Sequence, residues 1–271
     1  MRWNKAYELM SCFEGVCELY RAAGGADYLA AAVRHADGIL AHETTIVGPG
    51  TSNEHWCNGR TNQTAAVWHP METCVTATWM KYLFQLLRLT GEPRFADELE
   101  KNLYNGLLGA QMPDGHWWAY FSGINGERVP SQYQHADVGL SCCVVSGPRA
   151  LLLTPQWAVM NSAEGPVVNL YFPGSAEIVS PSGQPVRLIQ TTEYPVGGSV
   201  EIAIELDKPE AFTLALRIPA WSEQTRLMVN NHPVEVSAGR YVRIQRTWNR
   251  RDRVRLDLDM RGRILEAPDG N

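Results

Sequence analysis

Long hydrophobic runs are absent from this sequence of 271 residues. No segment approaches the roughly 20 consecutive apolar residues that a membrane-spanning helix needs. Residues 1–5 carry charges, but no apolar run follows them, so they do not have the pattern of a secretory signal peptide. We therefore predict a cytoplasmic protein without a membrane partner.

An excess of charge of one sign is also missing. The formal net charge is -5, and acidic and basic residues are mixed along the chain. A protein that binds nucleic acid through a basic surface is therefore not predicted. The chain is 45% hydrophobic and 20% charged, which is typical of a soluble globular protein. Nine tryptophans and ten tyrosines suit sugar rings or an ordinary core, and the ordinary core is the more common use.

Cysteines are few, and their spacing does not resemble a secreted disulfide framework. A chain of this length is long enough to bury a core without disulfides. A reduced compartment or a bound metal explains the cysteines better. The six positions are Cys12, Cys17, Cys57, Cys74, Cys142 and Cys143.

The first half of the sequence has a helical periodicity that repeats. Gly24 aligns with Gly91 and Tyr28 aligns with Phe95, so the two copies lie at one fixed offset. A helical hairpin repeated in this way is typical of a solenoid or an α/α toroid. Two copies are too few to close a toroid, so we predict a partial one over residues 1–155. Apolar residues recur at spacings of three and four along residues 5–22, 28–42, 76–89 and 95–107.

The character of the sequence changes after Pro155. Short runs follow, several of which alternate apolar and polar residues, with Pro, Gly or Asn between them. These runs predict an antiparallel β-sandwich over residues 156–271, incomplete at its C-terminal end. The fold class is therefore multidomain, α followed by β. The predicted strands are residues 167–171, 186–191, 200–206, 213–218, 226–229, 241–245 and 254–258.

Two short stretches offer a set of metal ligands. Glu72 and Cys74 precede a predicted helix, whose apolar stripe begins near Val75, and Cys142 and Cys143 follow the second hairpin. At a helix N-terminus the helix dipole favours thiolate and carboxylate. Three thiolates and one carboxylate make a tetrahedral set for zinc, whereas magnesium and calcium prefer oxygen ligands. We therefore predict a Zn2+ site at Glu72, Cys74, Cys142 and Cys143.

The alternative is that these cysteines are buried and chemically inert. Free cysteine is among the most buried residue types. Neither stretch has the Cys-x-x-Cys spacing of a zinc knuckle, so spacing alone slightly favours the inert interpretation. The inert interpretation applies more strongly to Cys12 and Cys17, which lie in a helical run with no ligand nearby in the sequence.

Glu54 lies in a loop between the two hairpins, beside His55 and Trp56. Long loops on a rigid scaffold often carry catalytic residues. A zinc-bound thiolate can act as a nucleophile, and glycoside cleavage with retention needs a nucleophile and a separate acid/base group. Glu54 is the best candidate for the acid/base group, although one glutamate in a loop is more often a solvated surface residue. We also predict that His55, Trp56 and, in a later aromatic loop, His135 contact the substrate.

The order of these motifs resembles one known family. The first half contains, in order, Glu72-Thr73-Cys74, Leu-Leu-Arg-Leu-Thr-Gly at 86–91, Leu-Tyr-Asn-Gly-Leu-Leu-Gly at 103–109 and the pair Cys142-Cys143. The second half contains Glu193-Tyr194-Pro195, Leu-Arg-Ile-Pro-Ala-Trp at 216–221 and Arg246-Thr247-Trp248. This arrangement resembles the zinc-dependent β-L-arabinofuranosidase family, glycoside hydrolase family 127 and its relatives. The resemblance covers nearly the whole chain, and the Glu-x-Cys and Cys-Cys combination is its most specific part.

The resemblance implies an (α/α)6 barrel followed by β-sandwich domains, and a retaining hydrolase that acts on β-L-arabinofuranosides. It makes Glu72, Cys74, Cys142 and Cys143 the zinc ligands. It also makes Cys142 the nucleophile, which forms a thioglycosyl intermediate, and Glu54 the acid/base residue.

The sequence departs from the family pattern in three places. Val-Val-Ser follows the cysteine pair where Pro-Pro-Asn is common, and the stretch between Glu54 and Glu72 is slightly long. Both departures indicate a divergent branch. Family members are also much longer, so we expect a fragment that lacks the first barrel helices.

The expected partner is a carbohydrate substrate, and the sequence does not predict an oligomeric state. Two other functions stay open. One is a zinc-stabilised carbohydrate-binding or scaffold protein without turnover. The other is a reduced-thiol protein that holds no metal.

Overall fold

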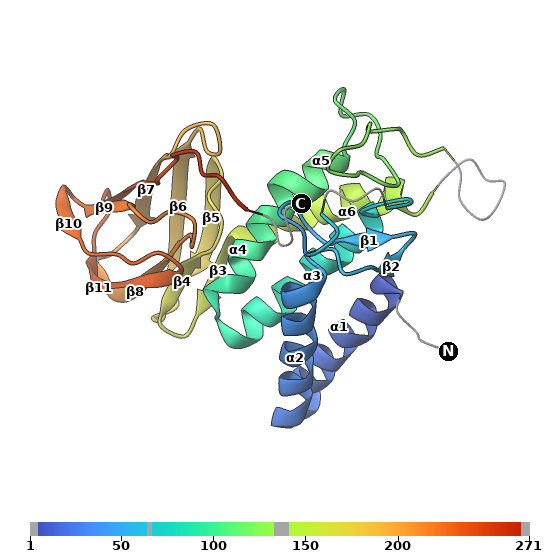
Figure 1. Cartoon of the computed structure of the whole chain (residues 1–271). Helices are drawn as coiled ribbons and strands as arrows, with labels where there is room; N and C mark the ends of the chain where they lie inside the picture. Colours follow the sequence, from blue (N-terminus) through green and yellow to red (C-terminus); the bar gives the residue numbers. More distant parts are fainter. Residues whose placement is uncertain (1–4, 64–66, 133–140, 267–271) are drawn as a thin grey trace. The chain divides into compact units, whose positions relative to one another are not determined.

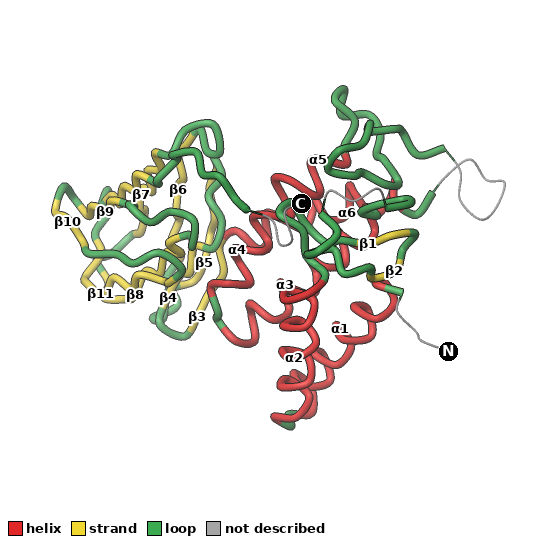
Figure 2. Tube along the Cα trace, viewed as in Figure 1, coloured by secondary structure: helices red, strands yellow, loops and turns green. Residues whose placement is uncertain are grey.

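A computed structural model describes residues 5–63, 67–132 and 141–266 (Figure 1). The chain divides into two compact units, one of residues 1–153 with 264–271 and one of residues 154–263. The first unit is helical and the second is rich in strands (Figure 2), which confirms the predicted order of α before β. None of the described helices is both long enough and apolar enough to span a bilayer.

Two helical hairpins frame the first unit. α1 (Ala6–Ala23) and α2 (Ala26–His42) form the first, and α3 (Thr73–Thr90) and α4 (Pro93–Lys101) form the second. Lys81 of α3 forms an ion pair of 3.0 Å with Glu14 of α1, and these residues are 67 positions apart in the sequence. The same positions of the two copies therefore pack against each other, and the predicted repeat is confirmed.

Each first helix of a hairpin ends at a glycine. Gly24 has a φ of 75° and Gly91 a φ of 68°, a backbone region that favours glycine. Their N–H groups donate to the carbonyls of Tyr20 and Leu87, which closes the last helical turn. The two hairpins therefore use the same local chemistry to turn the chain.

Helix α3 lies at the centre of the helical core. Trp79, Leu83 and Leu86 are completely buried, as the predicted apolar stripe requires. The stripe of the next helix is also buried, but part of it lies in a π-helical segment, Asn102–Leu107, followed by the short α5 (Leu108–Ala110). The side-chain amide of Asn102 donates a hydrogen bond to the backbone carbonyl of Glu98 at 2.7 Å. It competes there with the backbone hydrogen bonds of the helix, at the residue where the π-helical segment begins.

Loops and one further helix complete this unit. β1 (Thr51–Ser52) and β2 (His55–Trp56) form a small hairpin in the loop between the helical hairpins. α6 (Cys143–Ala158) starts at the predicted cysteine pair and continues past Pro155. The two units divide inside this helix, so the domain boundary predicted at 155 and 156 stays a prediction.

The second unit contains two sheets. Their strand orders are β10-β9-β12-β7-β6-β5 and β11-β8-β4-β3. Alternating side chains are buried along β6 and β7, for example Leu188 and Ile202. The strands are β3 (Val159–Ser162), β4 (Gly165–Val168), β5 (Gly174–Val179), β6 (Pro185–Thr192), β7 (Ser199–Leu206), β8 (Glu210–Ile218), β9 (Arg226–Val229), β10 (His232–Val234), β11 (Arg240–Trp248) and β12 (Arg253–Asp257).

One pairing corrects the prediction of a wholly antiparallel fold. β4 and β8 run parallel, with Val167 opposite Ala215. After β4 the chain enters the other sheet as β5, β6 and β7 and then returns as β8, and such a crossover allows parallel pairing. The stacking of the two sheets as a sandwich stays a prediction.

Candidate active site and metal centre

Four predicted ligands form one cluster in the helical unit. One ligand atom from each of Glu72, Cys74, Cys142 and Cys143 lies within 4.8 Å of the others. The Sγ atoms of Cys74 and Cys143 are 3.4 Å apart, and those of Cys142 and Cys143 are 4.0 Å apart. The Oε1 atom of Glu72 lies 3.9 Å from the Sγ atoms of both Cys142 and Cys143. The structure thus brings together residues from two distant stretches of the sequence.

Two helix N-termini position the cluster. Glu72 is the N-cap residue of α3, with extended backbone angles, and Cys74 lies in the first turn. Cys142 directly precedes α6, and its carbonyl accepts the N–H groups of Val145 and Ser146. The positive ends of two helix dipoles therefore face this cluster, which favours thiolate and carboxylate charge.

The donor set fits a zinc ion. A tetrahedral site with Zn–S distances of about 2.3 Å has ligand separations of about 3.8 Å, close to those of the cluster. Glu72, Cys74 and Cys143 are buried, with at most 3% of each residue exposed. The Oε2 atom of Glu72 is buried and has no hydrogen-bond partner among the described residues. Such an atom costs free energy unless a ligand satisfies it, so the cluster fits a cation.

The thiols of the cluster differ in acidity. Hydrogen bonds from the Cys143 and Cys74 thiols, aided by the Tyr120 hydroxyl, lower the pKa of Cys142 to about 3. Burial, together with hydrogen bonds to its neighbours, raises the pKa of Cys143. Burial also raises the pKa of the Glu72 carboxyl to about 8, and the nearby charges of Cys142 and Glu54 add to the rise. Cys142 is therefore the cysteine that most readily becomes a thiolate.

Glu54 lies beside the cluster, and Lys5 and Tyr120 both contact its carboxylate. Lys5 Nζ lies 2.5 Å from its Oε2 atom, and the Tyr120 hydroxyl donates to its Oε1 atom at 2.6 Å. The side chain of Glu54 is 14% exposed. The Tyr120 hydroxyl is also 3.9 Å from Cys142 Sγ, so one phenol connects the carboxylate to the cluster. Burial and the bond to Glu54 raise the pKa of Tyr120, which keeps the phenol protonated as a donor.

The segment that carries Tyr120 is fixed to the start of α3. The carbonyl of Tyr120 accepts the N–H of Thr73 at 3.0 Å, and the Thr73 hydroxyl donates to the carbonyl of Ala119. Gly147 lets this segment lie close to α6, because a Cβ there would come within 2.4 Å of the Trp118 ring. Hydrogen bonds to α3 and the close approach of the Trp118 ring to α6 thus set the position of the phenol.

A cavity of about 660 Å³ opens beside Glu54. Its lining includes Glu54, Tyr120, Phe121 and His69, and it does not include Cys142. Ligand pockets in proteins commonly have volumes of about 300 to 1,000 Å³. A sugar-sized molecule therefore fits on the carboxylate side of Tyr120.

The other predicted substrate residues are placed differently. His55 belongs to β2, and its Nδ1 atom lies 2.7 Å from the carbonyl oxygen of Asn53. Trp56 pairs with Thr51 in the same small hairpin. Neither side chain lines the cavity beside Glu54. His135 lies outside the described residues.

The sequence did not single out Lys5 or Tyr120. They contact Glu54 across 49 and 66 residues of sequence, and no local pattern reports such contacts. The repeat carried one usable signal, because Lys5 is the N-cap residue of α1 as Glu72 is of α3. Tyr120 had no signal beyond its place in an aromatic stretch.

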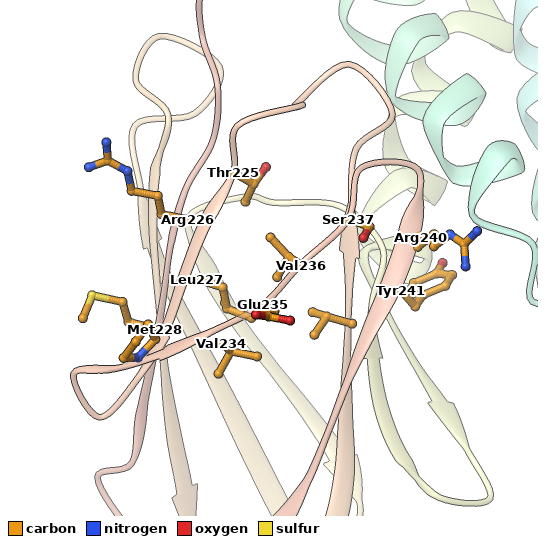
Figure 3. Close-up of a pocket in the computed structure, with 12 residues that line it drawn as sticks. Thr225, Arg226, Leu227, Met228, Val234, Glu235, Val236, Ser237, Arg240 and Tyr241 are labelled. Atoms are coloured by element: carbon orange, nitrogen blue, oxygen red, sulfur yellow. The ribbon is translucent and has the colours of Figure 1, made fainter.

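A second cavity, of about 700 Å³, lies in the strand-rich unit (Figure 3). β9, β10, β11 and the turn before β11 surround it. Its lining residues include no cysteine or histidine and one carboxylate, Glu235. The cavity therefore lacks the paired groups that acid/base or nucleophilic catalysis uses.

Two family models of glycoside hydrolase domains match this chain. Residues 2–152 match the family model described as β-L-arabinofuranosidase, GH127 catalytic domain, and residues 166–260 match the GH127 middle domain. The chain belongs to this β-L-arabinofuranosidase family, glycoside hydrolase family 127. The resemblance noted in the sequence is thereby confirmed.

Particular relatives share parts of this chain. A curated protein of Bifidobacterium longum, named non-reducing end β-L-arabinofuranosidase, is 26% identical over an alignment of 179 residues that covers 60% of this chain and 26% of that protein. A crystal structure of a GH127 β-L-arabinofuranosidase from Geobacillus stearothermophilus T6 superposes with a TM-score of 0.84 at 21% identity. That match covers 98% of this chain and 44% of the other.

The match to a further solved structure, titled a GH127 β-arabinofuranosidase, has a TM-score of 0.83 at 24% identity. It covers 94% of this chain and 42% of the chain in that structure. These likenesses show the fold. The chain spans about a quarter of the curated relative and less than half of the two solved structures.

Proposed function

We propose that this chain carries the catalytic centre of a retaining glycosidase that releases L-arabinofuranose from the non-reducing ends of β-L-arabinofuranosides. One observation supports the proposal most strongly. The Tyr120 hydroxyl lies 2.6 Å from the Glu54 carboxylate and 3.9 Å from Cys142 Sγ, so one phenol joins the proposed proton donor to the proposed nucleophile. The names of the family and of its curated relative supply the sugar.

The first step uses both groups. Cys142 Sγ attacks the anomeric carbon, and a C–S bond forms while the glycosidic C–O bond breaks. Glu54 gives its proton to the departing oxygen. The low pKa of Cys142 supplies the thiolate for this attack.

The second step reverses these roles. Glu54, now a carboxylate, takes a proton from water, and the water oxygen attacks the anomeric carbon. The C–S bond breaks, and Cys142 returns as a thiolate. Two displacements at one carbon give net retention of configuration. Lys5 and Tyr120 hold the Glu54 carboxylate on the side of the leaving oxygen throughout.

Glu72, Cys74, Cys142 and Cys143 would hold the zinc ion. When bound, the ion supplies the positive charge that keeps the thiols deprotonated and satisfies the buried Oε2 atom of Glu72. His55, Trp56 and His135 remain proposed substrate contacts. We also propose that the hairpins belong to an (α/α)6 toroid and that the two sheets form a sandwich, as the 67-residue repeat and the sheet order suggest.

The test compares the wild-type chain with Cys142→Ser, Glu54→Gln and the control Cys12→Ser, which changes an exposed cysteine outside the cluster. Zinc content and hydrolysis of an aryl β-L-arabinofuranoside are measured. We expect about one zinc ion per wild-type chain and losses of roughly 10³-fold in kcat/KM for Cys142→Ser and Glu54→Gln. The control keeps its zinc and activity. Full activity in either active-site variant would contradict the assigned roles.

The length comparison favours a second candidate, because the chain covers less than half of the solved relatives. In that case the chain is a zinc-stabilised carbohydrate-binding or scaffold protein. Binding of L-arabinose oligosaccharides without released product, together with unfolding on chelation, would support it.

A further inference from the structure

A stack of four aromatic rings runs from Tyr120 to the surface. Tyr120 packs on Phe121 with ring centroids 4.4 Å apart, Phe121 stacks on His69 at 4.5 Å, and His69 stacks on Trp68 at 3.8 Å. Trp68 is 65% exposed. The imidazole of His69 is therefore held between two larger rings, and only its edge remains available to other groups.

The backbone around His69 is strained in a way that fixes this position. His69 has a φ of 48° and Met71 a φ of 54°, values that L-residues rarely adopt, on either side of Pro70. The carbonyl of His69 accepts the N–H of Asn53, and the Ser52 hydroxyl donates to the carbonyl of Trp68. Because Glu54 directly follows Asn53, these bonds tie the aromatic stack to the proposed acid/base residue.

None of the described residues forms a hydrogen bond with the ring nitrogens of His69. His69 lines the same cavity as Glu54. A ring that is clamped on both faces and meets a polar cavity is a preorganised donor or acceptor. Sugar hydroxyls are suitable partners for such an edge, and the apolar rims of Phe121 and Val129 suit the C–H faces of a sugar.

The cavity lies on the leaving-group side of the reaction. Glu54 and Tyr120 line it and Cys142 does not, so it extends from the proton donor and away from the nucleophile. In glycoside cleavage the group next to the proton donor is the departing one.

We propose that this cavity binds the sugar unit that leaves, and that His69, clamped by Trp68 and Phe121, hydrogen-bonds its hydroxyls and sets the preference for a sugar leaving group. This inference rests on the proposed function. It assigns the site to a second sugar ring, beyond the arabinofuranosyl unit that is cleaved.

The kinetic test uses two substrates, a disaccharide with a β-L-arabinofuranosyl non-reducing end and methyl β-L-arabinofuranoside, whose leaving group is too small to reach His69. His69→Phe keeps an aromatic ring and removes both nitrogens. We expect kcat/KM to fall about tenfold for the disaccharide, the value of roughly one hydrogen bond, and to stay within about twofold for the methyl glycoside. An equal effect on both substrates, or no effect on either, overturns the proposal.

A second variant avoids the strained position. Trp68→Ala removes the exposed ring that packs on one face of His69. We expect kcat/KM to fall about threefold for the disaccharide and to change little for the methyl glycoside. His116→Ala and Tyr28→Ala are the controls, because they change an exposed histidine and an exposed aromatic ring that do not line the cavity. Both controls should retain the wild-type preference between the two substrates.

A binding measurement separates this inference from the proposed function. The disaccharide is titrated calorimetrically into Cys142→Ser and into Cys142→Ser with His69→Phe. If the wild-type chain hydrolyses neither glycoside, the proposed function fails, and a weaker Kd in the double variant still supports the sugar site. Equal Kd values in the two proteins overturn the site whatever the activity.

Discussion

Helix α1 and helix α3 begin at equivalent positions of the repeat, and the residue before each helix reaches the candidate site. Lys5 precedes α1 and pairs with Glu54, whereas Glu72 precedes α3 and joins the cysteine cluster. One N-cap position thus supplies a cation to one half of the site and a carboxylate to the other. Two residues with the same local backbone geometry therefore have different chemical roles.

The backbone contacts of the two helices are similar as well. The first helical N–H of α1 donates to the carbonyl of Glu54, and that of α3 donates to the carbonyl of Tyr120, both at 3.0 Å. The proposed acid/base residue and the phenol that holds it are therefore positioned by equivalent bonds from two copies of one unit.

Burial separates the two copies. α1 buries three residues, Ala6, Met10 and Cys17, whereas α3 buries twelve of its eighteen. The helix that begins at two of the candidate metal ligands, Glu72 and Cys74, is therefore the more enclosed one. Charge interactions are stronger where water is excluded, so the enclosed end of α3 suits the proposed metal centre.

The largest contrast should come from the two N-cap side chains. Glu72→Gln removes a ligand charge, and we expect zinc content to fall close to zero and kcat/KM to fall about 10³-fold. Lys5→Gln leaves the four ligands intact, so zinc stays near one per chain while kcat/KM falls about tenfold through misplacement of Glu54. Metal analysis and arabinofuranoside hydrolysis measure both. Loss of zinc in Lys5→Gln would show that the two halves of the site are not separable.

Truncation of equivalent core positions tests the burial difference. Leu83 of α3 is completely buried, and the matching position in α1 is Val16, which is partly exposed. Leu83→Ala should lower the free energy of unfolding by about 3 kcal/mol, and Val16→Ala by at most about 1 kcal/mol. Urea unfolding followed by circular dichroism at 222 nm gives both values. Equal losses would mean that α1 is as enclosed as α3.

The two terminal glycines allow a finer comparison. A Cβ would meet no atom within 4 Å at Gly24 or Gly91, so substitution by alanine carries only a conformational cost. Gly24 has a ψ of -156°, in a region nearly restricted to glycine, whereas Gly91 is left-handed helical with a ψ of 14°. Gly24→Ala should cost about 2 kcal/mol and Gly91→Ala about 1 kcal/mol of unfolding free energy. The same urea experiment measures them, and a reversed order would contradict the backbone assignment.

The smallest expected effect concerns the Lys5 and Glu54 pair. The hydrogen bond to Glu54 is the main cause that raises the pKa of Lys5 above its ordinary value of 10.5. Because the pKa of Lys5 is higher in the folded state, the ion pair stabilises the fold fully below pH 10.5 and loses this effect as the pH rises beyond that value. The difference in melting temperature between wild type and Lys5→Met should therefore be constant from pH 7 to pH 9 and shrink above about pH 10.5. A difference that grows with pH would exclude the pair as its source.

Periodicity predicted the helices well, because burial of one face imposes it. The segments expected at 5–22 and 76–89 became Ala6–Ala23 and Thr73–Thr90. Three strands of the second unit had no such signal. β3, β5 and β10 lie at sheet edges, and few or none of their residues are buried, so apolar alternation was weak or absent.

The cluster was predictable as a set of ligand types but not as a geometry. Glu72 and Cys74 carried a local signal, whereas their approach to Cys142 depends on how α3 and α6 pack. The support of Glu54 by Lys5 and Tyr120 depends on long-range contacts that no local pattern encodes. His69 could likewise not be predicted from the sequence, because its proposed role depends on ring stacking and on a strained backbone.

The two halves of the cluster are far apart along the chain. Glu72 and Cys142 are separated by 70 residues, which include α3, α4 and the segment of Tyr120. An ion bound to both halves would add its binding free energy to the stability of the fold, because the separated halves of the unfolded chain do not form the site. The proposed metal centre would therefore be a reversible cross-link across the second hairpin. A chelator would break this cross-link, whereas a disulfide reductant would not.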